Sequence, residues 1–152
     1  MEPSKIVQDI QYMLAPAIMI SSSALLLLGF QNKFSALFNR FRSLNQEKRF
    51  LSQKANRDSL ETSRLENLKE QLARIAKRVT HVKNAILFTY SAIVCFIMTS
   101  IFLFLNMYIS LQLHYLALSF FLVGLLLVLT SSILVIVEVS IAFNILRLES
   151  KS

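Results

Sequence analysis

The chain has 152 residues, 55% of them hydrophobic, and its mean hydropathy of +0.55 makes it more apolar than an ordinary water-soluble domain. Its formal net charge of +7 comes from 16 basic and 9 acidic residues. With only two Gly and two Pro, the sequence has few turn signals, which excludes an architecture of many short strands and favours a few long helices.

Three apolar segments are long enough to cross a hydrocarbon core about 30 Å thick, which takes roughly 20 helical residues. They cover residues 10–30, 85–108 and 116–137. The sequence therefore predicts an all-α membrane protein with three transmembrane helices in a lipid bilayer. The other segments are an external N-terminal tail at 1–9, a long connection at 31–84, a short link at 109–115, and an amphipathic extension with the C-terminal tail at 138–152.

Basic residues are concentrated in the long connection, which contains thirteen Lys and Arg and five Asp and Glu and so has a net charge of +8. Basic residues beside short loops stay on the cytoplasmic side of a membrane. We therefore expect segment 31–84 and the C-terminus to be cytoplasmic, and the N-terminus and the 109–115 link to be external. The residues nearest the membrane ends form a basic collar, which comprises Lys33, Arg40, Arg42, Arg78 and Lys83.

The collar has two interpretations, a solvated helical surface or a surface attracted to anionic lipid headgroups. Nucleic-acid binding is not expected, because acidic residues are interspersed with the basic ones and no binding motif occurs.

The cytoplasmic connection has the spacing of a helical hairpin. Apolar residues follow an alternating three-and-four spacing before the second span, at Leu65, Leu68, Leu72, Ile75, Val79, Val82 and Ile86. The same spacing follows the first span at Phe34, Leu37, Phe41, Leu44, Lys48 and Leu51, with one polar interruption. Such a seam is typical of a coiled coil, so we predict a long antiparallel hairpin with its tip near 55–59.

Candidate catalytic groups are few. The chain has one Cys and two His, and neither a nucleophile with a base partner nor a Cys/His cluster can be assembled from them, so we expect no enzymatic activity, no metal site and no cofactor. Cys95 lies inside an apolar run, where a small packing residue is the simplest interpretation.

Glu138 is the one acidic residue associated with a predicted span, either inside the membrane or at its inner interface. Carboxylates within membranes are costly enough to be candidates for function. One interpretation is a structural ion pair with Lys83 or another basic residue at the base of the hairpin. The other is a role in ion or proton handling.

The first span carries a repeat of small and polar residues. Gln8, Ala15, Ser22 and Gly29 recur every seven residues on one face, and Gln11 lies close to that stripe. Small side chains allow close helix contacts in lipid. The stripe can pack against the other two helices of the same chain, or it can line a contact or pore between copies.

The first third of the chain resembles a known family. The residues that carry the resemblance are Ile10-Gln11-x-Met13-x-x-Pro16 in the first span and Arg40-Phe41-Arg42-Ser43-Leu44 after it. They are similar to a family of small bacterial membrane proteins catalogued only as a domain of unknown function. The resemblance implies a bacterial inner-membrane location and three spans with a cytoplasmic helical hairpin, and it implies no activity.

Two functions fit these features. The first is a homo-oligomer that forms an ion-conducting pore around the first span, with the basic hairpins as a cytoplasmic collar. The second is a non-conducting scaffold or accessory subunit whose hairpin binds a cytoplasmic protein.

Overall fold

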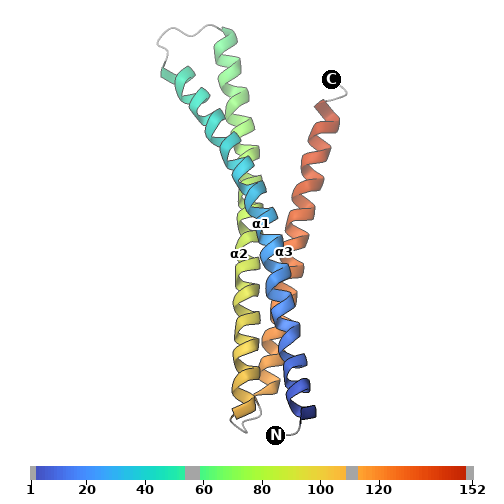
Figure 1. The fold of residues 1–152 in the computed structure, drawn as a ribbon. Helices are drawn as coiled ribbons and strands as arrows, with labels where there is room; N and C mark the ends of the chain where they lie inside the picture. The colour runs from blue at the N-terminus through green and yellow to red at the C-terminus, as the bar shows by residue number, and fades with distance from the viewer. Residues whose placement is uncertain (1–2, 54–58, 109–112, 150–152) are drawn as a thin grey trace.

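The computed structural model describes residues 3–53, 59–108 and 113–149, and this part of the chain forms three long helices (Figure 1). They are α1 (Pro3–Gln53), α2 (Ser59–Tyr108) and α3 (His114–Glu149). The all-α architecture is confirmed, and each helix is long and apolar enough to cross a membrane. Most of the expected hairpin tip at 55–59 and of the expected link at 109–115 lies outside the described residues.

Helices α1 and α2 are much longer than a membrane crossing requires. They contain 51 and 50 residues, and at about 1.5 Å per residue each measures roughly 75 Å, against a hydrocarbon core of about 30 Å. Helix α1 begins at Pro3, so most of the expected tail at 1–9 is helical. Proline is well suited to the first helical turn, where its missing N–H has no intrahelical partner to lose.

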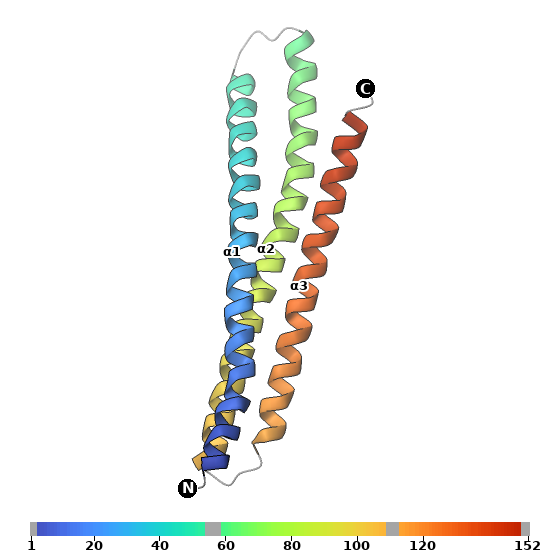
Figure 2. The same ribbon diagram turned by 45° about the vertical axis from the view of Figure 1, so that its right-hand side comes forward.

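Helix α2 lies between the other two. It contacts both α1 and α3 extensively, whereas α1 and α3 contact each other little. Figures 1 and 2 show the start of α1, the end of α2 and the start of α3 at one end of the molecule. The end of α1 and the C-terminal end of α3 lie toward the opposite end.

The contact between α2 and α3 depends on small residues. The Phe96 side chain is fully buried, and a β-carbon added to Gly124 would lie 2.7 Å from its Cε1 atom. The same ring packs against Phe121 with 5.7 Å between ring centroids. Ala92 on α2 and Ala117 on α3 are buried as well. Small residues let helix backbones approach closely in lipid, where packing provides much of the association energy.

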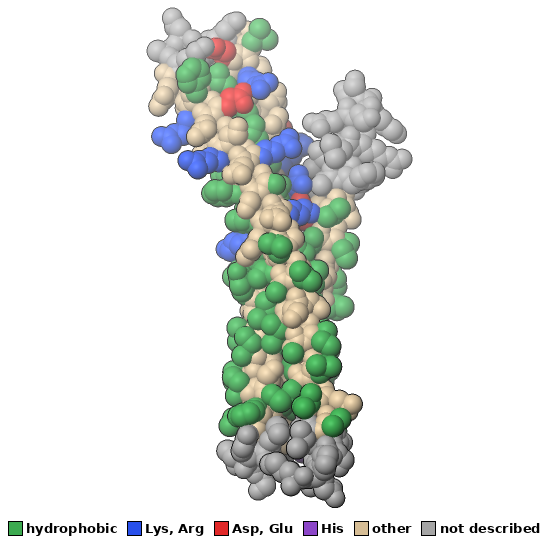
Figure 3. Space-filling model, in the orientation of Figure 1, with side chains coloured by type: hydrophobic (Ala, Val, Ile, Leu, Met, Phe, Trp, Pro, Cys, Tyr) green, Lys and Arg blue, Asp and Glu red, His purple; other side chains and the backbone are tan. Residues whose placement is uncertain are grey.

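One half of the molecule shows many hydrophobic side chains and no charged ones on the face seen in Figure 3. In the most apolar windows of α1, α2 and α3, only 17%, 22% and 11% of the residues are buried, so large side chains such as Leu25 and Leu126 point outward. Several hydroxyls here bond to the carbonyl four residues earlier, as Thr89 does to Ala85 and Thr130 to Leu126. This surface matches a hydrocarbon environment, where polar groups must be satisfied within the protein.

The other half of α1 and α2 carries most of the charged side chains (Figure 3). Leu65, Leu68, Leu72 and Ile75 of α2 are buried, and Leu37 of α1 is buried as well. The remaining apolar positions of the α1 seam are half-buried. Arg64 of α2 also donates hydrogen bonds from Nε and Nη2 to Glu47 Oε1 of α1, at 3.2 and 2.9 Å. Apolar burial and this ion pair therefore join the two helices beyond the apolar half.

Candidate functional site

The most distinctive polar site is a cluster of three charged residues, one from each helix. Glu138 lies on α3, Lys33 on α1 and Arg78 on α2. The Glu138 side chain is 0% exposed, whereas its neighbours Val137 and Val139 on α3 are exposed. Because helical neighbours point in different directions, α3 directs Glu138 inward while its apolar neighbours face outward. We call these three residues the charge cluster.

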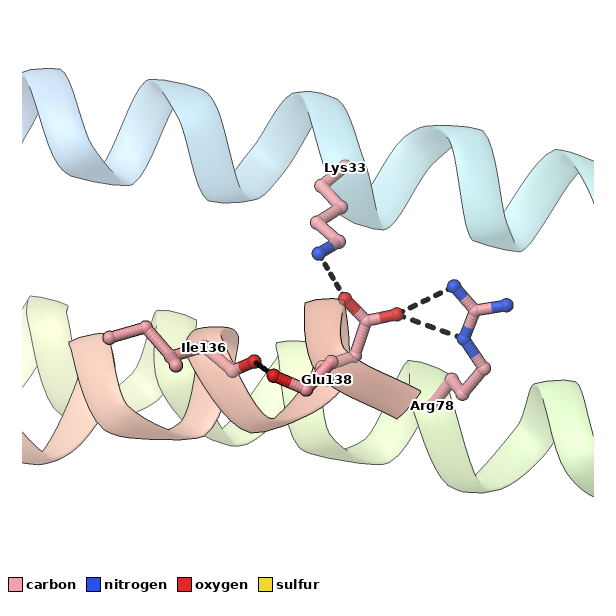
Figure 4. A network of polar contacts seen from close by, with 5 residues as sticks. Lys33, Arg78, Ile136 and Glu138 are labelled. Carbon is pink, nitrogen blue, oxygen red and sulfur yellow. Dashed lines mark hydrogen bonds and ion pairs between the residues drawn. The ribbon is translucent and has the colours of Figure 1, made fainter. Parts of the chain in front are cut away.

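The carboxylate of Glu138 is held by both of its oxygens (Figure 4). Arg78 donates from Nε to Oε1 at 2.9 Å, and its Nη2 lies 2.8 Å from the same oxygen. Lys33 Nζ forms an ion pair with the other oxygen, Oε2. Charge-assisted contacts of this kind compensate the large cost of burying a carboxylate.

The charge cluster carries one more positive than negative charge. Lys33 and Arg78 share a single carboxylate, and their side chains remain 28% and 19% exposed. The carboxylate is therefore enclosed, while both basic side chains are partly exposed.

The cluster also marks the boundary between the two halves of the molecule. No Asp, Glu, Lys or Arg occurs between Asp9 and Lys33, from Asn84 to Tyr108, or from His114 to Val137. Lys33 and Glu138 are thus the first charged residues met after crossing the apolar parts of α1 and α3. From this pattern we expect the cluster to lie near the edge of the hydrocarbon core.

The basic collar divides into two groups. Lys33 and Arg78 belong to the charge cluster, whereas Arg40, Arg42 and Lys83 are exposed. Glu138 therefore pairs with Lys33 and Arg78, while Lys83 lies outside the cluster. The pairing could not be foreseen residue by residue, because its members come from three helices and share no local spacing.

The stripe on the first span does not pack inside the subunit. Gln11, Ala15, Ser22 and Gly29 are all exposed, and a β-carbon added to Gly29 would meet no atom within 4 Å. The Gln8 side chain lies outside the described part of the chain. The inner face of α1 instead comprises Pro16, Ser23, Leu27, Phe30 and Leu37.

Two polar features were not singled out from the sequence. The Ser23 hydroxyl is buried and has no hydrogen-bond partner among the described residues. Gln31 Nε2 of α1 donates to the Tyr90 hydroxyl of α2 at 2.9 Å. No local pattern indicates either feature, since each depends on how α1 is rotated against its neighbours. Within the described ranges, no group of three His, Cys, Asp or Glu is placed to hold a metal ion.

The helices and the charge cluster define a multi-pass, all-helical membrane protein with three spans. A family model described as "Protein of unknown function (DUF2721)" matches residues 13–148. The chain belongs to this family, as the resemblance in its first third implies. No curated protein and no solved structure matches it.

Proposed function

We propose that this protein is a non-enzymatic homo-oligomer that assembles around α1 and conducts ions across the bacterial inner membrane. The observation that carries the proposal is the exposure of Gln11, Ala15, Ser22 and Gly29 on one face of α1. Small residues on an outward face permit close approach of a second copy. A polar side chain such as Gln11 also finds partners there that lipid does not offer.

Packing within the subunit argues for a path between copies. Helix α2 packs against both α1 and α3, and the fully buried Phe96 ring lies against Gly124. We therefore place the conducting path at the junction of several subunits.

The proposed orientation places the charged half of α1 and α2 in the cytoplasm as an antiparallel coiled-coil hairpin. Its support is the net charge of +8 on residues 31–84, together with the burial of Leu65, Leu68, Leu72 and Ile75. In this orientation the N-terminus is external and the C-terminus is cytoplasmic.

A second candidate function is a scaffold whose hairpin binds a cytoplasmic protein. It is favoured by two large apolar side chains near the far end of the hairpin, Phe50 at 69% exposure and Leu60 at 77%. Both lie beyond the apolar half of the molecule, where a protein partner could cover them.

The mass and conductance of purified protein test the primary proposal. We expect a closed oligomer in lipid nanodiscs and a conductance after reconstitution into planar bilayers. Ala15→Leu should weaken the oligomer because it adds bulk to the stripe. Ala17→Leu is the matched control, since Ala17 is also exposed and lies on a different face of α1.

Each outcome decides between the candidates. A monomeric wild-type protein would reject the pore. A closed oligomer that conducts no ions would favour the scaffold. Equal effects of Ala15→Leu and Ala17→Leu would show that the stripe is not the subunit contact.

A further inference from the structure

We propose that Lys33 and Arg78 together bind the phosphate of an anionic phospholipid headgroup at the edge of the bilayer. The inference is independent of ion conduction. It rests on the charge balance, exposure and position of the charge cluster, which has two cations for one carboxylate.

Lys33 and Arg78 have more hydrogen-bond donors than Glu138 uses. A guanidinium group has five N–H donors and an ammonium group has three. Arg78 uses Nε and Nη2 on Glu138 Oε1, and Lys33 Nζ faces Oε2. Among the described residues, Glu138 is the only ion-pair partner of either cation. Donors therefore remain on both side chains after Glu138 is satisfied.

Both basic side chains of the charge cluster are partly accessible from outside the protein. Lys33 and Arg78 are 28% and 19% exposed, while Glu138 is fully buried. An approaching anion therefore meets two cations and is shielded from direct contact with the carboxylate. Arginine is well suited to this role because its planar fork matches phosphate oxygens.

The position of the charge cluster along the helices also suits a lipid headgroup. The cluster lies where the apolar parts of α1 and α3 end, at residues 33 and 138. Lipid phosphates lie just outside the hydrocarbon core, and basic pockets between transmembrane helices bind such headgroups. A lipid anchored here keeps its acyl chains beside the exposed apolar side chains, which a free phosphate ion cannot do.

Glu138 also has a positioning role in this site. By holding Arg78 through two nitrogens, it keeps that flexible side chain at one place. Fixing Arg78 beforehand lowers the entropic cost of binding. Lys83, five residues beyond Arg78, is exposed and has no ion pair among the described residues, so only diffuse attraction acts there.

The test compares lipid retention by the full-length protein. The protein is purified in neutral detergent with equal amounts of phosphatidylglycerol and phosphatidylcholine, and native mass spectrometry gives the ratio of the two lipids bound. Wild type should prefer phosphatidylglycerol. Lys33→Gln should lower that preference about fivefold, the effect of losing one cation near the bilayer surface. Arg78 still holds Glu138 Oε1 in this variant, which favours correct folding.

Two further variants separate a specific site from other causes. Lys83→Gln removes the same charge outside the cluster and should lower the ratio less than Lys33→Gln does. Glu138→Gln removes the negative charge and retains an oxygen for Arg78, so it should raise the preference. If Lys33→Gln and Lys83→Gln lowered the preference for phosphatidylglycerol equally, the proposal would be overturned. A folded Glu138→Gln protein with a reduced preference for phosphatidylglycerol would overturn it as well. If Glu138→Gln does not fold, the comparison of Lys33 with Lys83 still decides.

A final measurement distinguishes a lipid headgroup from free phosphate. Millimolar inorganic phosphate should leave the bound phosphatidylglycerol in place, because it lacks the acyl chains. Displacement of the lipid by inorganic phosphate would overturn the assignment to a lipid.

Discussion

Arg78 on α2 directs both Nε and Nη2 to a single oxygen, Oε1, of Glu138 on α3. Sixty residues of sequence separate the two. Because Lys33 of α1 reaches the other oxygen of the same carboxylate, one buried side chain links all three helices. Removing it leaves two cations without their partner.

We therefore expect Glu138→Ala to lower the free energy of unfolding by about 3 kcal/mol, as for other broken buried ion pairs. The control is Glu70→Ala, since Glu70 forms an exposed ion pair with Arg74 one helical turn away. Exposed pairs contribute at most about 1 kcal/mol. Thermal unfolding in detergent measures both variants. Equal losses would show that the charge cluster is no stronger than a surface pair.

The two glycines should respond oppositely to the same substitution. Gly124→Ala places a methyl group 2.7 Å from the Phe96 ring, which is buried and has little room to move. We expect Gly124→Ala to lower the free energy of unfolding by about 1–3 kcal/mol, which is typical of overpacking. Gly29→Ala meets no atom within 4 Å and should stabilise the subunit by up to about 1 kcal/mol through helix propensity. Melting temperatures of both variants in detergent check this, and a stable Gly124→Ala protein would contradict the close α2–α3 packing.

The seam between α1 and α2 can be tested with a buried charge. Leu68 is 1% exposed and Leu60 is 77% exposed, although both lie on α2 beyond the apolar half. Leu68→Asp should destabilise this region by about 3 kcal/mol, because it buries a carboxylate without a partner. Leu60→Asp should have almost no effect. Limited proteolysis measures the difference, and equal resistance of the two variants would rule out the seam.

Orientation is accessible to chemical labelling in intact cells. In a background where Cys95 is replaced by Ala, a cysteine at His114 should react with an impermeant reagent added from outside. A cysteine at Gln53 should react only after the cells are opened. Both positions are exposed, so the membrane and not burial controls the reaction. External labelling at Gln53 would invert the proposed topology.

The three spans were predictable because membrane thickness is a constraint on length alone. An apolar run of roughly 20 residues is visible in any sequence, whatever its neighbours are. Among the seam positions, Leu65, Leu68, Leu72 and Ile75 were also visible, and they are buried. Their spacing records the pitch of one helix, which is a local property.

The partners of Glu138 required information that no local pattern contains. Five basic residues lie near the predicted membrane ends, and no sequence pattern distinguishes one from another as a partner of Glu138: Lys33, Arg40, Arg42, Arg78 and Lys83. Only the rotation of each helix decides that Lys33 and Arg78 turn inward while the others face outward. The same holds for the first span, where the repeat identified a face of α1 but not whether that face meets another helix of the subunit.

Helix α2 contains neither glycine nor proline in its 50 residues, and it runs without interruption from the charged half to the far end of the apolar half. Sharp bends in helices need such residues or a local defect in the backbone ladder. Between Ser59 and Tyr108, α2 therefore has no residue at which a sharp bend is expected, and it packs against both neighbours. In the proposed orientation, we expect a displacement of the charged end of α2 to reach its apolar end without a hinge.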